Sequence, residues 1–384
     1  HDDFVKNKML KGFYYADLKA DAKEDKVGIA FRELTRKFEE AGLYKTNYNF
    51  YYKKAVVYSL MFASVVAGVT MSESMWVHAM AGVMLGMFWQ QVAFLGHDIG
   101  HNSVTRSRTL DSYWGLFVGN FLTGISIGWW KRSHNVHHIV TNSAEHDPDI
   151  QHLPIFAPSP IYLKTPIFST FFERYLPLDS SAHFLVKFQH FLYYPVMAFA
   201  RFNLYVQSLT HATGTGAYSI NEVLFRRDLQ ILTLAGFWVW LITLTMQLPT
   251  WPSRVLFFLL AHNVAGLLHV QILLSHYYMP IYSGITYDTH ENGFVNTQLQ
   301  HSLDIDCPVW MDWFHGGLQF QVEHHLWPKL PRHSYRTVKP ILIAFCKEHG
   351  LEYHQETFFK ANCNMISHLK ETSKSARSFN QIFR

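Results

Sequence analysis

The chain has 384 residues, a formal net charge of +4, 24 histidines and three cysteines. Charged residues make up only 16% of it, against about 25% in a typical soluble domain, so the composition favours a membrane protein over a soluble one. The small net charge and the lack of a basic aromatic motif exclude nucleic acid as the expected partner, and a membrane surface suits the 16% aromatic content better. The odd cysteine count and its spacing indicate reduced thiols in a cytosolic environment.

Residues 1–54 form a polar and charged N-terminal region, which we expect to be a cytosolic linker ahead of the main domain at 55–384. Within it, residues 29–41 carry apolar side chains three to four positions apart and end before Gly42. This pattern predicts an amphipathic helix with a glycine stop. The helix either lies on a membrane interface or docks on another domain.

Four apolar segments are long enough to cross a bilayer. They are residues 55–71, 75–95, 229–246 and 255–278. Short links join them into two antiparallel pairs, with a hairpin in a soluble core as the alternative for the first pair. The first link lacks Lys and Arg, whereas Lys53, Lys54, Arg106 and Arg108 flank the other ends of that pair. The positive-inside rule places those ends in the cytosol, and an even number of spans places both termini there too.

The segments between and after the spans have their own patterns. Residues 110–130 are apolar but broken by glycines, which favours an interfacial or re-entrant helix pair. Prolines predict an irregular loop over 153–166, and the aromatic stretch 184–205 contains charges that favour a helix lying in the membrane plane. Residues 279–384 are polar. The expected fold is therefore an all-α membrane protein with four transmembrane helices and a cytosolic helical cap.

Histidines recur at helical spacing in three short stations, 97–101, 134–138 and 321–325. Residues three or four apart share one helix face, and neutral imidazole is a good ligand for iron, copper and zinc. One such pair also occurs by chance, but three stations at the ends of apolar spans are a strong signal. The candidate ligands are His97, His101, His134, His137, His138, His324 and His325. Seven ligands exceed the four of a single zinc, so we expect a metal pair.

Further groups are expected around this centre. His269 and His276 lie two helical turns apart in the fourth apolar segment, and His276, nearer the cytosol, is the preferred additional ligand. The alternative is an ordinary histidine at the membrane boundary. Metal-bound imidazoles usually bond a second group through their other nitrogen, for which Asp98, Asp147 and His315 are the candidates.

The three stations resemble the three histidine boxes of the membrane fatty-acyl desaturase superfamily. The first position of the third box is Gln321 rather than histidine, which is typical of the front-end desaturases. The stretches 141–154, 268–276 and 303–321 are similar to sphingolipid Δ8 desaturases, and plant Δ6 acyl desaturases share part of the pattern. The resemblance runs from about residue 30 to residue 370.

This resemblance implies two iron ions bound by the seven box histidines, by His276 and by Gln321, with zinc as a substitute on overexpression. It implies a reaction with O2 that places a double bond at Δ8 of a sphingolipid long-chain base, or alternatively a Δ6-type acyl desaturation. It also implies an endoplasmic reticulum membrane and a lipid substrate. More remote alternatives are a lipid hydroxylase with the same centre, a membrane zinc hydrolase acting on ceramide amides, and a non-enzymatic metal or haem carrier.

Electron supply is the one departure from the family pattern. Front-end desaturases are usually fused to a cytochrome b5 domain with a His-Pro-Gly-Gly haem motif, and this sequence has none. Either such a domain precedes residue 1, with residues 1–54 as its linker, or a separate cytochrome b5 and its reductase are partners. Haem is expected only in that partner or domain.

Overall fold

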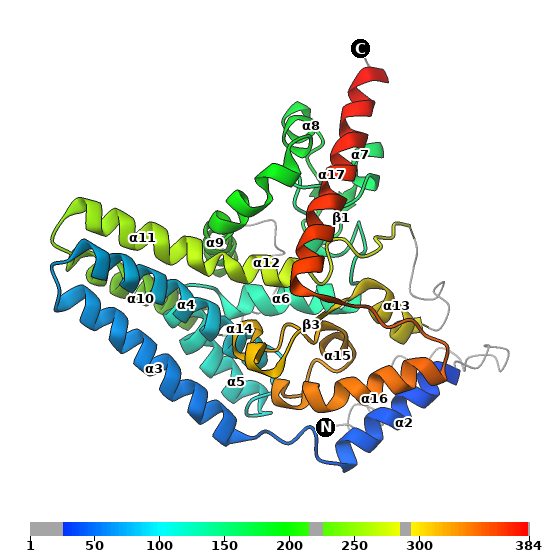
Figure 1. Cartoon of the computed structure of the whole chain (residues 1–384), viewed down its shortest axis with the longest axis horizontal. Helices are drawn as coiled ribbons and strands as arrows, with labels where there is room; N and C mark the ends of the chain where they lie inside the picture. Colours follow the sequence, from blue (N-terminus) through cyan, green and yellow to red (C-terminus); the bar gives the residue numbers. More distant parts are fainter. Residues whose placement is uncertain (1–25, 215–225, 285–292, 383–384) are drawn as a thin grey trace.

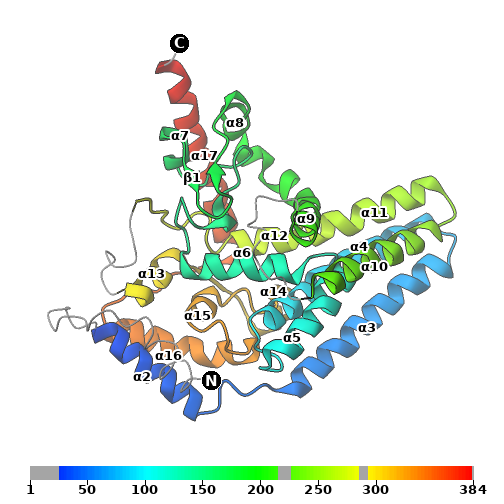
Figure 2. The ribbon, with the colours of Figure 1, turned by 180° about the vertical axis from the view of Figure 1, so that it is seen from behind.

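The computed structural model describes residues 26–214, 226–284 and 293–382, and helices dominate it. Figures 1 and 2 show a bundle of long helices on one side and a collection of shorter elements on the other. The two sheets of the described residues have two short strands each. The expected all-α class is confirmed.

Four helical segments of the described chain are long and apolar enough to cross a membrane. They are α3 (Tyr48–Thr70), α4 (Met75–Gly100), α10 (Arg227–Met246) and the continuous run of α11 (Trp251–Ala265) and α12 (Leu267–Leu273). They lie side by side in both ribbon views. Each corresponds to one of the four apolar segments predicted from the sequence.

The ends of these helices differ from the prediction. The first begins at Tyr48, seven residues early, because the Asn47 side chain caps it by accepting a hydrogen bond from the Phe50 backbone N–H (3.4 Å). The fourth ends at Leu273 rather than at residue 278, so His276 lies in the turn that follows. The expectation that His269 and His276 share one helix face is therefore wrong, because the helix stops between them.

Two glycines allow α4 and α11 to pack closely. A Cβ on Gly82 would lie 2.7 Å from the Phe257 carbonyl oxygen, and one on Gly86 would lie 2.6 Å from that of Ala261. Both distances are shorter than any carbon–oxygen contact allows. Small residues four positions apart bring membrane helices together in this way, and here they join the N-terminal half of α4 to α11.

Residues 108–139 form the helix pair expected for the glycine-broken stretch. They comprise α5 (Arg108–Gly115), the π-helical segment η3 (Leu116–Leu122) and α6 (Ile127–Ile139). The bend between η3 and α6 includes Gly124 at a φ of 73°, which glycine adopts without strain. The end of η3 is tied to the bundle, because Trp89 Nε1 donates to the Leu122 carbonyl (3.1 Å).

The segment after α6 is mostly irregular before it becomes helical. It contains η4 (Pro148–Ile150), α7 (Ile161–Lys164), the antiparallel strands β1 (Phe168–Ser169) and β2 (Arg174–Tyr175), α8 (Ser180–Val186) and α9 (Gln189–Thr213). The predicted loop over 153–166 is thus interrupted by one turn of helix. The predicted aromatic helix is confirmed as α8 and α9, and its orientation to a membrane stays a prediction.

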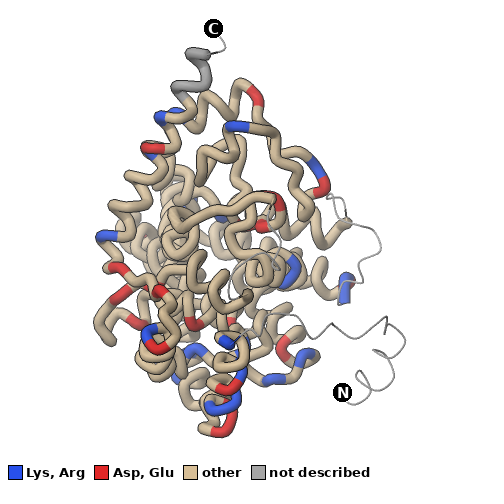
Figure 3. The backbone as a smooth tube through the Cα atoms, turned by 90° about the vertical axis from the view of Figure 1, so that its right-hand side faces the viewer, with Lys and Arg blue, Asp and Glu red and all other residues tan. Residues whose placement is uncertain are grey.

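The remaining elements build a cap beside the bundle. They are α2 (Lys26–Glu40), α13 (Gly293–His301), β3 (Asp304–Asp306), η6 (Val309–Met311), α14 (Asp312–His315), α15 (Gln321–Leu326), η7 (Arg332–Ser334), α16 (Tyr335–Glu348), β4 (Gln355–Thr357) and α17 (Phe358–Ile382). Strands β3 and β4 pair in parallel. Figure 3 faces this side of the molecule and shows acidic and basic positions intermixed.

The amphipathic helix predicted near the N-terminus is α2, and it docks on the cap. Phe31 stacks on Trp327 with ring centroids 4.9 Å apart, and Phe38 contacts the same indole at 5.0 Å. Of the two interpretations of this helix, docking therefore holds. The division at residue 54 falls inside α3 and stays a prediction, and residues 1–25 lie outside the described part of the chain.

Candidate metal centre

Three helices bring the histidine stations together. His97 occupies the last turn of α4 and His101 follows it, three histidines lie on α6, and His324 and His325 lie on α15. The first group comprises His97, His101, His134 and His324, and the second comprises His137, His276 and His325. Within each group the ligand atoms all lie within 4.8 Å of one another. The structure thus separates the histidines into two clusters, each compact enough for one metal ion.

His138 lies between the two clusters. Its Nε2 is 3.0 Å from Nε2 of His134 in the first cluster. Its ring stacks on His325 of the second cluster at a centroid distance of 4.2 Å. All seven box histidines and His276 therefore form one continuous assembly of imidazoles.

The donor atoms of this assembly fit a metal. Nε2 of His97, His101, His324 and His325 is buried and has no hydrogen-bond partner within the described part of the chain. Burial, reinforced by the neighbouring histidines, holds the pKa of His101, His134 and His324 well below the usual range. These rings are therefore neutral, with a lone pair available for a metal. Buried polar atoms without partners are costly in a folded protein, and metal ions at the two clusters would satisfy them.

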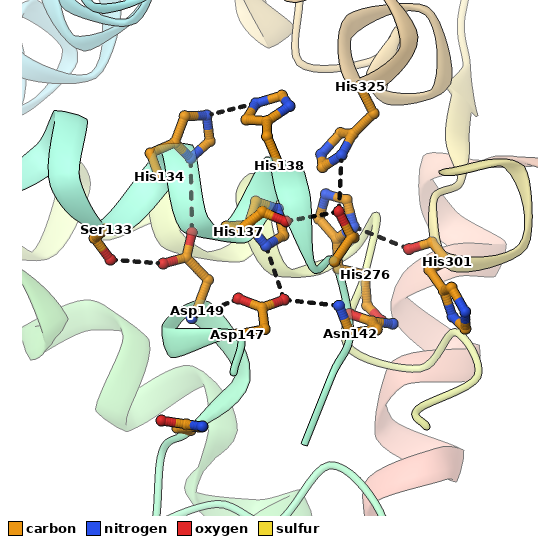
Figure 4. Close-up of polar contacts among 12 residues, drawn as sticks. Ser133, His134, His137, His138, Asn142, Asp147, Asp149, His276, His301 and His325 are labelled. Carbon is orange, nitrogen blue, oxygen red and sulfur yellow. Dashed lines mark hydrogen bonds and ion pairs between the residues drawn. The ribbon is translucent and has the colours of Figure 1, made fainter. Parts of the chain in front are cut away.

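Asp147 anchors the second cluster, as Figure 4 shows. His137 Nδ1 donates to the fully buried Asp147 carboxylate (2.9 Å), which also accepts from the backbone N–H of Asn142 (2.8 Å). Burial disfavours the charged imidazole, but the attraction of Asp147 and Asp149 prevails and raises the pKa of His137 to about 9. The hydrogen bond occupies Nδ1 and leaves Nε2 of His137 to face the cluster.

Other histidines are oriented in the same way through Nδ1. His276 donates to the His301 carbonyl (3.0 Å) and His325 to Gln298 Oε1 (2.8 Å). His324 Nδ1 lies 2.9 Å from the Tyr335 hydroxyl. With one ring nitrogen fixed by the protein, the other is aimed at a metal position, which is the usual arrangement around bound metals.

Sequence reasoning did not identify Gln298 or Tyr335. Gln298 lies 27 residues before His325 and Tyr335 lies 11 residues after His324, so no helical spacing links either residue to its histidine. The Gln298 amide also donates to the His138 carbonyl (2.9 Å). These contacts depend on the packing of α13, α15 and α16, which the sequence pattern does not specify.

Of the three predicted outer groups, only Asp147 contacts a box histidine at hydrogen-bond distance. Asp98 instead forms an ion pair with Arg332 (2.9 Å) and accepts a hydrogen bond from the Tyr51 hydroxyl (3.0 Å). Its carboxylate is 4.0 Å from His97 Nδ1, too long for a hydrogen bond. Asp98 therefore fixes the C-terminal end of α4 rather than a histidine ring.

His315, the third predicted outer group, lies beside aromatic rings, and a role in contacting the substrate stays a prediction. Its ring packs against Phe314 and Phe358, and burial lowers its pKa to about 4. In the described residues these aromatic rings, and no box histidine, are its ring contacts. Asp149, which is not among the predicted outer groups, lies 3.6 Å from His134 Nδ1.

A cavity of about 490 Å³ adjoins the clusters. His97, His134, His137 and His276 line it, together with Gln321 at the first position of α15. Its apolar and aromatic wall includes Val92, Phe94, Val118, Ile127, Trp129, Trp130, Phe156, Phe171, Phe172, Leu176, Met197, Leu268, Ile272 and Leu318. The cavity suits an elongated apolar ligand, and the buried Gln321 amide faces it beside the clusters. Whether Gln321 binds metal stays a prediction.

Comparison with known proteins gives consistent matches. The family model for fatty acid desaturases matches residues 74–357. A "Delta(8)-fatty-acid desaturase" of Helianthus annuus is 39% identical over 97% of this chain and 78% of its own length. A "Delta 8-(E)-sphingolipid desaturase" of Emericella nidulans is 39% identical over 94% of this chain and 65% of its own length. An "Acyl-lipid (9-3)-desaturase" of Borago officinalis is 38% identical over 97% of this chain and 80% of its own length.

Proposed function

The chain belongs to the fatty acid desaturase family and is an oxidoreductase, and on this basis we propose that it introduces a Δ8 double bond into the long-chain base of a sphingolipid. The overall reaction takes two hydrogens from neighbouring methylenes and reduces one O2 to two waters with two further electrons and two protons. The observation that carries the proposal is the pair of histidine clusters on the wall of an apolar cavity.

We propose iron for both clusters. Imidazole ligands suit iron, copper and zinc alike, but only a redox-active metal meets the needs of a desaturase. An iron pair supplies the oxygen-dependent chemistry that removes hydrogen from an unactivated methylene, which no side chain achieves alone. His97, His101, His134 and His324 would bind one ion, and His137, His276 and His325 the other, with His138 between them. Gln321 is a neutral amide and would be at most a weak oxygen ligand.

The protein itself positions the reactants and excludes water. The apolar wall holds the lipid chain and leaves bulk water out, while His97, His134, His137 and His276 present one edge of the assembly to the chain. Asp147 keeps the Nδ1 proton of His137 in place, and Gln298 does the same for His325. Rigid rings and a confined chain together select which methylene meets the centre.

Two relatives favour the Δ8 position, one of them on a sphingolipid, and a third favours another substrate. The sunflower and Emericella proteins are named for Δ8 desaturation, the latter of a sphingolipid. The borage relative is named for an acyl-lipid and supports, as second candidate, a front-end desaturation of an acyl chain. Both reactions use the same clusters and cavity, and they differ in the polar end of the lipid.

We also propose that cytochrome b5 and its reductase supply the electrons, and that the protein resides in the endoplasmic reticulum with the clusters on the cytosolic side. Lys53, Lys54, Arg106 and Arg108 support this orientation, since they flank the cluster ends of α3 and α4 whereas the opposite link has no basic residue.

Product analysis tests the proposed reaction. The chain is expressed with a cytochrome b5 and its reductase in yeast that makes saturated long-chain bases, with candidate polyunsaturated fatty acids fed in parallel. Mass spectrometry then locates new double bonds in both lipid classes. A new Δ8 bond in the bases is expected. New bonds only in fed acyl chains would replace the first candidate by the second, and a hydroxylated product without an alkene would contradict both.

A further inference from the structure

Arg201 is a buried cation on the wall of the cavity. Its side chain on α9 is 2% exposed and lines the same cavity as the histidine clusters. Its Nε donates to the Tyr205 hydroxyl (2.7 Å), a second nitrogen donates to the Thr123 carbonyl, and the guanidinium lies over the Trp89 ring at 4.3 Å. Within the described ranges no ion pair joins Arg201 to a carboxylate.

A guanidinium has five N–H donors and no acceptor. Hydrogen bonds to Tyr205 and Thr123 use Nε and one terminal nitrogen of Arg201, and the guanidinium has further N–H groups beyond these two. A buried charge lacking a counter-charge is expensive unless an acceptor reaches it, and the ring of Trp89 offsets only part of that cost. A ligand that enters the cavity with an oxygen atom would complete the set.

His269 is a second polar group on this wall. It lies on α12 and lines the cavity, and both of its ring nitrogens are buried. Among the described residues neither nitrogen makes a hydrogen bond of regular geometry, although the Gly266 backbone one turn earlier interacts with the ring. His269 belongs to neither histidine cluster, and the sequence analysis preferred His276 as the additional metal ligand. Its polarity is therefore not explained by the metal centre.

Arg201 lies on α9 and His269 on α12, and these two helices cross close to both residues. A Cβ on Gly266 would lie 2.7 Å from the Ala198 Cα atom, so α12 starts in backbone contact with α9. Arg201 follows Ala198 by three residues and His269 follows Gly266 by three residues. Each side chain therefore lies about one helical turn from the crossing point, and both line the same cavity.

Gln321 is also buried on this wall, but it lies beside the clusters. Two polar groups farther along the wall, Gln151 and His152, are already paired. Gln151 donates to the Ala144 carbonyl (2.9 Å) and accepts from Ser169 (2.6 Å). His152 Nδ1 lies 3.2 Å from the Tyr277 hydroxyl. The side chains of Arg201 and His269 are accordingly the polar groups best able to receive a polar part of a lipid inside the cavity.

We propose that Arg201 and His269 form a subsite that binds the hydroxyl and amide oxygens at the polar end of the lipid substrate. The subsite rests on the proposed function, since it names how that substrate is held. His269 on α12 and His276 in the turn after it line the same cavity. The subsite therefore holds the polar end at one place on the wall and the clusters lie at another, and this separation selects the methylenes that react.

A binding experiment without turnover tests the subsite. The metal-loaded protein, kept without an electron donor, is titrated with a saturated ceramide and with its analogue lacking the long-chain-base hydroxyls. Because hydrogen bonds to charged groups are strong, the parent is expected to bind the hydroxylated ceramide at least about tenfold more tightly. Arg201→Gln and His269→Leu are each expected to reduce this ratio to within about twofold.

Ile272→Ala is the matched control, because Ile272 lines the same cavity from the same helix. It should weaken binding of both lipids and leave their ratio as in the parent. Arg201 also ties α9 to Thr123, so thermal unfolding of each variant is recorded. If Arg201→Gln does not fold, the binding ratio of His269→Leu is the test of the subsite. Equal binding of the two lipids by the parent, or an unchanged ratio in His269→Leu, would overturn the subsite.

The readout also separates the subsite from the proposed reaction. If the subsite is wrong but the proposed reaction is right, the yeast experiment still gives the Δ8 product, and the substitutions leave the ratio of the two binding affinities unchanged. A failed substrate assignment shows itself in yeast as bonds in acyl chains alone, with no preference of the parent for the hydroxylated ceramide.

Discussion

Replacing Asp147 by asparagine is expected to weaken metal binding at the second cluster while the protein stays folded. The carboxylate is fully buried and accepts three hydrogen bonds, from His137 Nδ1 (2.9 Å), Asn142 N–H (2.8 Å) and Asp149 N–H (2.9 Å). An amide of the same shape offers only one oxygen, so its NH2 group must face at least one of these donors.

The size of the effect follows from these contacts. Each lost hydrogen bond to the buried charge costs about 1.5–3 kcal/mol, and the loss of a carboxylate behind a metal-bound histidine typically lowers metal affinity by about 10- to 100-fold. We therefore expect Asp147→Asn to lower the affinity of one of two metal ions by about 10- to 100-fold. The first cluster, oriented by other residues, should keep its ion.

The assay is chelator competition on purified protein, with metal per chain determined by elemental mass spectrometry. Asp149→Asn is the matched control, since Asp149 lies 3.6 Å from His134 Nδ1 and its side chain is 28% exposed. It should change metal affinity by much less. The reasoning is refuted if Asp147→Asn binds both ions as the parent does, or if the Asp149 variant shows the greater loss.

Three further substitutions test other parts of the account. His138→Ala should abolish lipid product and leave the protein in the membrane, because its ring joins the two clusters; product above background in a lipid assay would argue against the metal assignment. Gln321→His should retain product if that position tolerates a ligand, and complete loss of product would instead assign Gln321 to the shape of the cavity. Gly86→Val should destabilise the bundle by about 1–3 kcal/mol or more, because a Cβ would lie 2.6 Å from the Ala261 carbonyl oxygen; thermal unfolding in detergent measures this. Gly96→Ala is its control, since the nearest atom would be 3.8 Å away, and equal melting of the two variants would contradict the packing argument.

The sequence predicted the parts of the molecule that depend on local pattern. Apolar length identified the four long helices, and the i, i+3 and i+4 spacing of His134, His137 and His138 identified one face of α6. His276 was found through its position near the end of an apolar segment, although the helix ends before it. Its approach to His137 and His325 results from the turn after Leu273, which no periodicity describes.

The sequence pattern could not predict contacts between elements that are far apart in the chain. Asp98 is adjacent to His97 in sequence, but its carboxylate forms an ion pair with Arg332 at the start of η7, which packing brings close. His315 is close to the third station in sequence, yet α14 turns its ring toward Phe358. Gln298 and Tyr335 are anchors that only folding of the cap creates. Sequence proximity was therefore a poor guide to the groups around the histidines.

The measurement that tests the account most directly is the number of iron ions in protein that forms product. The purified chain is reconstituted with ferrous iron without oxygen, its metal content is determined, and product formation is then followed with O2, cytochrome b5 and its reductase. The two clusters predict two iron ions per chain and a product that requires oxygen. One zinc ion per chain, with turnover that needs neither oxygen nor electrons, would contradict the account and indicate a hydrolase.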